Sequence, residues 1–231
     1  MHADRILAIS DIHGQNKKFL LLLKKAEYNP DHDLLVVCGD MIDRGTENLA
    51  TVNTCIELKK KGAIILKGNH EQFAQECIKD MLLERPSMDL RLWVNHNGGS
   101  NTYDELLALS KSQLKNLQNF FSTLPLYFAK DHYIFTHAAA NTTKPIEKNT
   151  ENETVWSKDT FYYRPAYKDK IMIFGHKPTW LLRPSSKNNT PENATIWFDI
   201  NFNDKIGIDC GSIFGGKLAA LELPGMREFY V

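Results

Sequence analysis

The sequence predicts an α/β fold in which two β-sheets pack together and helices cover their outer faces. In the first third of the chain, apolar runs rich in β-branched residues alternate with amphipathic segments. This order is typical of parallel strands joined by right-handed helical crossovers. From residue 126 onward, short strand-like runs follow one another with little helical periodicity. The chain has 231 residues, enough for one sizeable core, so we expect a single domain over residues 1–231.

The opening third contains three strand-and-helix pairs. Each predicted strand is a short apolar run, as buried parallel strands are. Each predicted helix has apolar residues at a spacing that forms one face. The strands are expected at 5–10, 34–38 and 63–67, and the helices at 17–27, 46–60 and 71–84.

The rest of the chain is expected to be richer in strands. The paired glycines Gly98 and Gly99 predict a tight backbone passage within 90–102. Ser110 is a candidate N-cap for a helix that reaches about residue 122. Residues 141–153 and 184–193 are polar and poor in large apolar side chains, so they are expected to be surface loops. The strands are expected at 126–129, 132–136, 171–174, 195–199, 206–209, 217–222 and 227–230.

Composition excludes some classes of function. The chain has 28 basic and 28 acidic residues, so it lacks the global positive charge of a nucleic-acid-binding or membrane-surface protein. No apolar run approaches the ~18 residues of a membrane span, and no signal-like segment stands at the N-terminus. The four cysteines are scattered, which favours reduced thiols. A cytoplasmic protein without nucleic-acid or membrane partners is expected.

A polar turn at 39–45 is the centre of the functional prediction. It follows the apolar run 34–38 and carries Asp40, Asp43 and Arg44. Charged side chains at the end of a buried strand are costly unless they bind something. Carboxylates bind divalent cations, and the planar guanidinium of arginine binds phosphate. The turn therefore predicts a site for metal and phosphate.

The same pattern recurs at four more strand ends. In open α/β sheets the carboxyl ends of the strands form the ligand-binding crevice. We therefore expect these five strand ends to meet at one site. The polar residues at the other four ends are Asp11 and His13, Asn69 and His70, His137, and His176.

Three motifs carry a family resemblance. Asp11-x-His13, Gly39-Asp40-x-x-Asp43-Arg44-Gly45 and Gly68-Asn69-His70-Glu71 occur in this order, each at the end of a predicted strand. With them, the chain resembles the phosphoprotein phosphatase group of calcineurin-like metallophosphoesterases, above all its bacterial and phage members. The resemblance implies a sandwich of two mixed sheets flanked by helices. It extends over nearly the whole chain, through Trp93, Asn97-Gly98-Gly99, Thr102, His137, 175–179 and 208–218.

The resemblance also implies roles for the site residues. Two divalent metal ions, with manganese expected and iron or zinc as alternatives, would share the carboxylate of Asp40. His70 would be the general acid, oriented by Asp43, and Arg44 would bind the phosphate. Glu71 is expected either to support the site from outside or to start a helix, and Asp209 to support the site near His176. Asp11, His13 and Asp40 would hold one metal, and Asp40, Asn69, His137 and His176 the other.

Two departures from the family pattern bear on the choice of substrate. Ala138, Ala139 and Ala140 follow His137, where glycine is usual. Lys158 stands two residues after Trp156, where the family carries a second phosphate-binding arginine. Lysine lacks the bidentate fork of arginine. Arg164 is an alternative to Lys158 as the second cation.

These inferences predict a dinuclear-metal phosphomonoesterase. Its expected substrates are phosphoserine, phosphothreonine and phosphotyrosine in proteins, hydrolysed by direct attack of a metal-bridging hydroxide. The first alternative is symmetrical hydrolysis of bis(5′-nucleosyl) tetraphosphates. A nucleic-acid phosphodiesterase is a further alternative, which the neutral charge disfavours. A catalytically silent phospho-binding scaffold is the alternative of another class; it is disfavoured because all the expected ligands, His70 and Asp43 are present.

Overall fold

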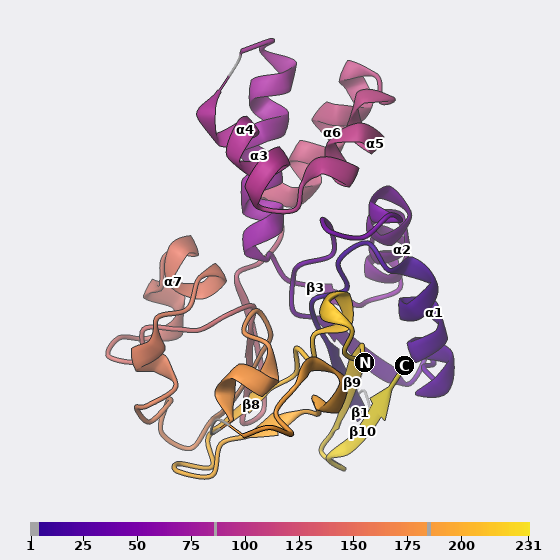
Figure 1. The fold of residues 1–231 in the computed structure, drawn as a ribbon. Helices are drawn as coiled ribbons and strands as arrows, with labels where there is room; N and C mark the ends of the chain where they lie inside the picture. Colours follow the sequence, from indigo (N-terminus) through magenta and orange to yellow (C-terminus); the bar gives the residue numbers. More distant parts are fainter. Residues whose placement is uncertain (1–4, 86, 184–185) are drawn as a thin grey trace.

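In the part of the chain that the structure describes, ten strands form two mixed five-stranded sheets (Figure 1). The computed structural model describes residues 5–85, 87–183 and 186–231. Hydrogen-bonded neighbours follow the order β10-β9-β1-β2-β3 in the first sheet and β4-β5-β6-β8-β7 in the second. Each strand overlaps a predicted one, so the predicted two-sheet α/β architecture is confirmed. The strands are β1 (Arg5–Ile9), β2 (Asp33–Val37), β3 (Ile64–Ile65), β4 (Tyr127–Lys130), β5 (Tyr133–Thr136), β6 (Ile171–Phe174), β7 (Trp197–Phe198), β8 (Lys205–Gly207), β9 (Ala219–Leu223) and β10 (Arg227–Tyr230).

Each sheet contains three parallel strands. In the first sheet β2 runs parallel to both β1 and β3, and in the second β6 runs parallel to both β5 and β8. The remaining strands, β4, β7, β9 and β10, pair antiparallel. All the predicted metal ligands therefore follow the carboxyl ends of parallel strands.

Strand β1 shows how the two sheets share the core. Its side chains alternate between the two faces of the sheet, as the pleat requires. Ile6 and Ala8 belong to the apolar cluster that also contains Phe135 of β5, so they face the second sheet. Leu7 and Ile9 belong to a second cluster with the helices. One apolar run thus serves two cores, which explains why β1 is apolar on both faces.

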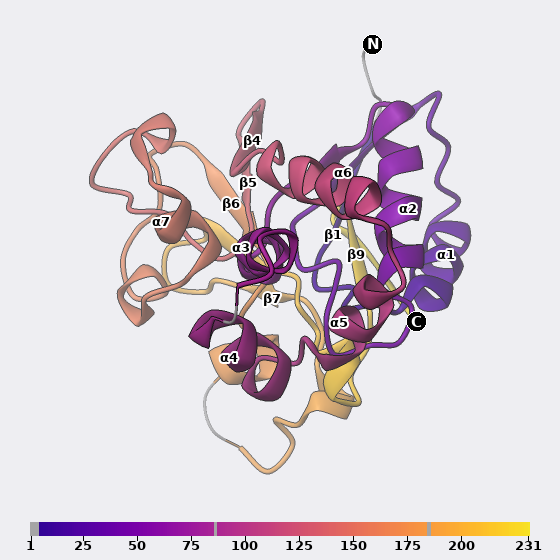
Figure 2. The same cartoon turned by 90° about the horizontal axis from the view of Figure 1, so that it is seen from above.

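Among the described residues, seven helices surround the sheets. In Figures 1 and 2, α1 and α2 lie beside the first sheet, α7 lies on the side of the second, and α3 to α6 form a layer over the carboxyl ends of the strands. Four of these helices match the predicted ones, although α3 begins at Asn69 rather than at residue 71. The helices are α1 (Asn16–Lys25), α2 (Asn48–Lys60), α3 (Asn69–Leu82), α4 (Met88–His96), α5 (Ser100–Leu107), α6 (Lys111–Ser122) and α7 (Glu151–Val155).

Helices α4 and α5 were not predicted. Ser87 caps α4 by accepting a hydrogen bond from the backbone N–H of Leu90 (3.0 Å). The predicted tight passage at Gly98 and Gly99 lies between the two helices, and a Cβ on Gly99 would stand 2.5 Å from the Trp93 ring. Only glycine permits this close packing of a backbone on an indole.

Residues 141–153 are not wholly a loop, contrary to the prediction. They include a 3₁₀ turn at Ile146–Lys148 and the start of α7. Glu153 accepts a hydrogen bond from the backbone N–H of Thr150 (2.8 Å), which caps α7, and Val155 is buried. In the second predicted loop, 184–193, residues 184 and 185 lie outside the described residues, and Pro191–Asn193 form a 3₁₀ turn.

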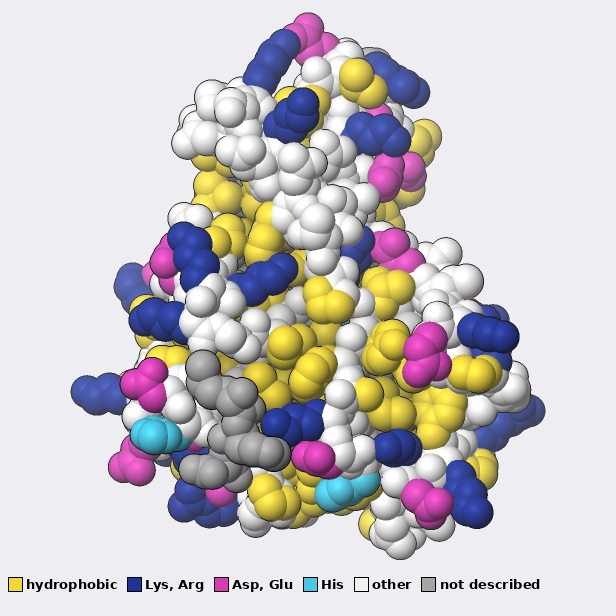
Figure 3. Space-filling view, turned by 180° about the vertical axis from the view of Figure 1, so that it is seen from behind, with side chains coloured by type: hydrophobic (Ala, Val, Ile, Leu, Met, Phe, Trp, Pro, Cys, Tyr) yellow, Lys and Arg dark blue, Asp and Glu magenta, His cyan; other side chains and the backbone are white. Residues whose placement is uncertain are grey.

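The four cysteines are free and buried. Burial raises the pKa of Cys77 and Cys210 to about 12 and raises the pKa of Cys38 and Cys55 as well. None of the helices in the described part of the chain is long and apolar enough to cross a membrane. On the face shown in Figure 3, basic and acidic side chains are interspersed around an apolar middle and do not form a basic stripe.

Candidate metal centre and active site

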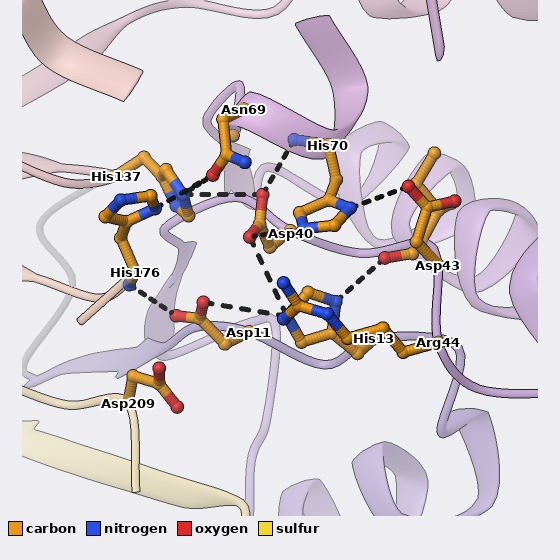
Figure 4. A network of polar contacts seen from close by, with 12 residues as sticks. Asp11, His13, Asp40, Asp43, Arg44, Asn69, His70, His137, His176 and Asp209 are labelled. Atoms are coloured by element: carbon orange, nitrogen blue, oxygen red, sulfur yellow. Dashed lines mark hydrogen bonds and ion pairs between the residues drawn. The ribbon is translucent and has the colours of Figure 1, made fainter. Parts of the chain in front are cut away.

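The predicted metal ligands meet where the carboxyl ends of the parallel strands of the two sheets face each other (Figure 4). Asp11 and His13 follow β1, Asp40 follows β2, and Asn69 follows β3. His137 and His176 come from the second sheet, after β5 and β6. All these side chains are buried except that of His176, which is partly exposed. The predicted convergence of five strand ends is confirmed.

His13 and two carboxylates form one half of the site. The Nδ1 atom of His13 lies 2.9 Å from the carbonyl oxygen of Ile42, to which it donates a hydrogen bond. The other ring nitrogen, Nε2, therefore keeps its lone pair. It lies 3.7 Å from a carboxylate oxygen of Asp40 and 3.9 Å from one of Asp11. This is a donor set that fits a divalent cation.

His137, His176 and Asn69 form the other half with the same Asp40. His137 donates from Nδ1 to the carbonyl oxygen of Cys38 (2.7 Å), which leaves Nε2 as the free ring nitrogen. That Nε2 lies 2.9 Å from Oδ1 of Asn69 and 3.4 Å from Oδ1 of Asp40. Nδ1 of His176 lies 2.9 Å from the same Asn69 oxygen. Lone pairs gathered in this way repel one another unless a cation lies among them, so the donors fit a metal ion.

Asp40 belongs to both halves. Its carboxylate lies within 4.8 Å of ligand atoms on His13 and His70 on one side and of His137 and His176 on the other. The backbone N–H of His70, in the first turn of α3, donates to Oδ1 of Asp40 (3.1 Å). A carboxylate at a helix N-terminus is stabilised by the unpaired N–H groups there.

The backbone of the site is strained. Asp11, His13, Asp40, Asp43 and His176 all have positive φ, between 48° and 73°. Each such non-glycine residue costs free energy and persists only where the surrounding structure imposes it. Here the left-handed turns aim five side chains at one point, a feature that the residue pattern alone did not reveal.

Two glycines allow the carboxylates to approach the backbone. A Cβ on Gly68 would lie 2.2 Å from Oδ1 of Asp40, and one on Gly175 would lie 2.1 Å from Oδ2 of Asp11. Any side chain at either position would displace a carboxylate.

His70 and Asp43 are paired as predicted. Nδ1 of His70 lies 2.6 Å from Oδ2 of Asp43. Nε2 of His70 is buried without a hydrogen-bond partner in the described structure and lies 3.8 Å from a carboxylate oxygen of Asp40. A buried, unsatisfied nitrogen aimed into a ligand cluster is available to a substrate oxygen.

Trp93 and Thr102 also hold Asp43, and sequence reasoning assigned them no role. The indole N–H of Trp93 donates to Oδ2 (2.6 Å), and the hydroxyl of Thr102 donates to Oδ1 (2.5 Å). Both come from the unpredicted helices α4 and α5. The only available signal was the place of both residues within the family resemblance.

Glu71 connects the turns of the site. Its two carboxylate oxygens accept hydrogen bonds from the backbone N–H groups of Gly68 (2.8 Å), Asp40 (2.9 Å) and Met41 (2.8 Å). It thus holds the turn after β2 against the start of α3, in agreement with its expected supporting role.

Arg44 reaches the ligand cluster, and Phe214 packs on it. Nη1 of Arg44 lies 2.7 Å from Nε2 of His13, and its guanidinium carbon lies 5.2 Å from the centre of the Phe214 ring. The backbone N–H of Arg44 donates to the carbonyl oxygen of Gly98 (2.8 Å). The arginine is therefore positioned from two sides.

The second predicted cation lies elsewhere. Lys158 and Arg164 both line a pocket of about 340 Å³ whose lining includes none of the candidate metal ligands. Asp209 is buried after β8 and accepts from the backbone N–H of Gly211 (2.8 Å). Among the described residues it makes no hydrogen bond to His176. Burial raises the pKa of Asp209, the negative charge of Asp11 raises it further, and Figure 4 places Asp209 beside Asp11.

Burial dominates the electrostatics of the site. It lowers the pKa of His13 and His137, which favours neutral rings that can bind metal. It also lowers the pKa of His70. It raises the pKa of Asp40 well above the usual range, with the charge of Asp11 adding to the effect. Without added positive charge, these carboxylates resist ionisation, so the electrostatics also fit a cationic ligand.

Comparison with known proteins decides the family. The model of the calcineurin-like phosphoesterase family matches residues 4–215. This chain is a calcineurin-like phosphoesterase. It is a metal-dependent phosphatase, and enzymes of this family use a dinuclear site for divalent metal ions.

The phosphoesterase has relatives of two kinds over most of its length. It is 27% identical to an asymmetrical bis(5′-nucleosyl)-tetraphosphatase of Halalkalibacterium halodurans, over 94% of this chain and 89% of the relative. It is 26% identical to serine/threonine-protein phosphatase 1 of Salmonella typhimurium, over 92% of this chain and 89% of that protein. A cold-active protein tyrosine phosphatase shares the fold, with a TM-score of 0.66 and 16% identity over 98% of this chain and 75% of that chain.

Proposed function

We propose that this phosphoesterase hydrolyses phosphate esters at a centre of two divalent metal ions that share Asp40. The observation that carries the proposal is the membership of this one carboxylate in both ligand groups. Asp11 and His13 complete one group, and Asn69, His137 and His176 complete the other. The donors are imidazole, carboxylate and amide, which suit manganese, iron or zinc better than calcium. We propose manganese as the metal to test first.

When bound, the two metal ions activate the attacking water and neutralise the phosphate oxygens. The protein side chains then have separate tasks. Arg44 binds the phosphate through its planar fork. His70 gives a proton from Nε2 to the leaving oxygen, because its Nδ1 is held by Asp43. Trp93 and Thr102 fix the Asp43 carboxylate and so fix the direction of the imidazole.

The first candidate substrate is a phosphorylated serine, threonine or tyrosine of a protein, as predicted from the sequence. The relative named serine/threonine-protein phosphatase 1 supports it. The second candidate is a bis(5′-nucleosyl) tetraphosphate, which two observations favour: the relatives with that name, and the cationic pocket of Lys158 and Arg164. The assembled acid and ligand set disfavours a catalytically silent scaffold.

Metal-stripped protein re-supplied with manganese tests the proposal. Metal content is measured by mass spectrometry, with two ions expected for each chain. Phosphate release from phosphoserine, phosphothreonine and phosphotyrosine peptides is compared with turnover of diadenosine tetraphosphate. Two molecules of ADP would mark symmetrical cleavage, and ATP with AMP asymmetrical cleavage. Two bound ions without turnover of any phosphate ester would overturn the proposal.

A further inference from the structure

A pocket beside the metal centre is not explained by the chemistry described so far. It has a volume of about 340 Å³, within the range of small-molecule sites. Ala139 and Ala140, which stand where the family usually has glycine, contribute to its lining. Only Ala138 separates Ala139 from the candidate ligand His137, so the pocket begins close to the metal centre.

Trp156 connects the pocket to the metal centre. It lines the pocket, and its ring contacts the ring of His176 edge to face, with centroids 5.7 Å apart. It is also held from α3, because its indole N–H donates to Gln72 (2.8 Å) and its ring packs against Phe73 (6.0 Å). The indole is therefore a fixed aromatic wall, of which 37% is exposed.

The pocket has a positive charge that is not neutralised. Neither Lys158 nor Arg164 forms a side-chain ion pair within the described ranges 5–85, 87–183 and 186–231. The acidic residue of the lining, Glu153, is instead paired with Lys144 (2.7 Å) outside the lining. Two cations without acidic partners favour an anionic ligand.

Neutral hydrogen-bonding groups complete the lining. Asn141, Thr143 and Thr160 are among them, and they bring amide and hydroxyl groups next to the aromatic wall. Together, the wall, the polar groups and the cations match a ligand that carries a heterocycle and phosphate. A phosphoserine side chain offers neither the ring nor the second phosphate.

We propose that this pocket receives the leaving group of a nucleoside polyphosphate. A phosphate of the leaving group binds Lys158 and Arg164, and its base lies against Trp156. Hydrolysis breaks the phosphoanhydride bond and adds one water: the water oxygen bonds to the transferred phosphorus, one proton goes to the leaving oxygen through His70, and the other goes to solvent. This proposal rests on the proposed function and specifies the substrate class.

Charge-removing variants test the pocket on the manganese-loaded enzyme. Lys158→Ala with Arg164→Ala should lower kcat/KM for diadenosine tetraphosphate by about a hundredfold, since each lost charge-assisted contact costs about tenfold. Hydrolysis of p-nitrophenyl phosphate, which has no second phosphate, should change by less than about threefold. Lys148→Ala with Lys168→Ala is the matched control, because both lysines are exposed and lie outside the lining.

A variant that fills the pocket gives independent support. Thr143 lies in the lining and is exposed, so Thr143→Trp narrows the pocket without disturbing the core. It should lower turnover of diadenosine tetraphosphate and spare p-nitrophenyl phosphate. Three results would overturn the pocket assignment. An equal fall in turnover for both substrates would place Lys158 and Arg164 in the general phosphate site. The other two results are no fall in turnover for either substrate and a larger fall for a phosphoserine peptide.

Binding measurements separate this proposal from the proposed function. Calorimetry compares ADP with inorganic phosphate on wild type and on the Lys158→Ala, Arg164→Ala double variant. The double variant should bind ADP at least about tenfold more weakly and bind phosphate unchanged. Weaker ADP binding by the double variant, in an enzyme that turns over no substrate, would contradict only the proposed function. Unchanged ADP binding by the double variant, with normal turnover of p-nitrophenyl phosphate, would contradict only the assignment of the pocket.

Discussion

The metal centre and the pocket beside it are built in opposite ways. The side chains of the centre are almost all buried, stand on strained turns and are held by second partners, as His13 is by Ile42 and His137 by Cys38. The cations of the pocket, Lys158 and Arg164, are exposed and stand on a segment of short helical turns. Rigid strand ends suit chemistry that needs fixed geometry, whereas surface segments can vary and suit substrate choice. The two regions should therefore respond differently to substitution.

Asp40→Asn should break the centre most severely. The amide keeps the shape of the side chain and can still accept from the backbone N–H of His70, but it loses the charge shared by the two ligand groups. Turnover should fall by at least about a thousandfold for every substrate, as measured with p-nitrophenyl phosphate and diadenosine tetraphosphate. The far-ultraviolet circular dichroism should be unchanged. The matched control is Asp104→Asn, an exposed position on α5, which should keep full activity.

His70→Asn should give the next largest loss, and its size should depend on the leaving group. Removing a general acid costs about 10²–10⁴-fold. The loss should be large for a phosphoserine peptide, whose alkoxide needs a proton, and smaller for p-nitrophenyl phosphate, whose phenolate leaves readily. An equal loss for both substrates would argue that His70 acts by another route than proton donation.

Trp93→Phe should lower kcat by about tenfold, because it removes one charge-assisted hydrogen bond to Asp43. KM and the metal content should stay constant, since Trp93 contacts neither the phosphate-binding Arg44 side chain nor a candidate metal ligand by hydrogen bond. Thr102→Val is the parallel variant on the other oxygen of the same carboxylate. A change confined to KM would contradict the positioning role.

Phe214→Ala should have a smaller effect, which should be confined to substrate binding by Arg44. Phe214 is 48% exposed, yet its ring packs on the guanidinium of Arg44. The loss of a partly exposed cation–π contact should raise KM for p-nitrophenyl phosphate by about two- to fivefold with kcat little changed. Phe214→Tyr keeps the ring and should behave as wild type; failure of that variant would point to a steric role instead.

Glu153→Gln, in the pocket lining, should have the smallest effect, a slight loss of thermal stability. Lys144, together with the backbone N–H of Thr150, lowers the pKa of Glu153 to about 2. A lowered folded pKa means that the stabilising contribution is complete above the unfolded value of about 4.5 and is lost as the pH falls toward 2. Wild type should thus melt slightly higher than the variant at pH 7, and thermal scans should show the gap closing below pH 4.5. A gap that persists at pH 2 would contradict the ion pair as its cause.

Sequence reasoning reached the strands and the candidate site because both depend on local signals. The composition of an apolar run such as 34–38 is enough to predict that it is a buried strand. Polar residues at the carboxyl ends of such strands then meet because of the geometry of parallel sheets. The helix boundaries failed where tertiary contacts decide: α4 and α5 pack on either side of Gly98 and Gly99, whose local preference is for a turn. Residues 141–153 failed for the same reason, since contacts such as the Ala138–Thr154 backbone hydrogen bond (2.8 Å) hold α7.

The contacts that hold the site residues in place were harder to predict than the metal ligands themselves. That Trp93 donates to Asp43 depends on the path of α4, and that Glu71 binds three backbone N–H groups depends on how the turn after β2 meets α3. Positive φ at His13 and His176 is imposed by the assembled fold. No residue pattern along the chain carries this information, because each contact joins segments that are remote in sequence.

The burial of all four cysteines makes the protein a convenient host for site-specific labels. Thiolates react with maleimides and thiols do not, and burial keeps these four groups protonated and out of reach of the reagent. Tyr163 is 75% exposed and lies between the lining residues Phe161 and Arg164, so Tyr163→Cys would supply the residue that takes up a dye. The native chain can then be labelled for fluorescence or spin-resonance spectroscopy without first replacing any of its own cysteines.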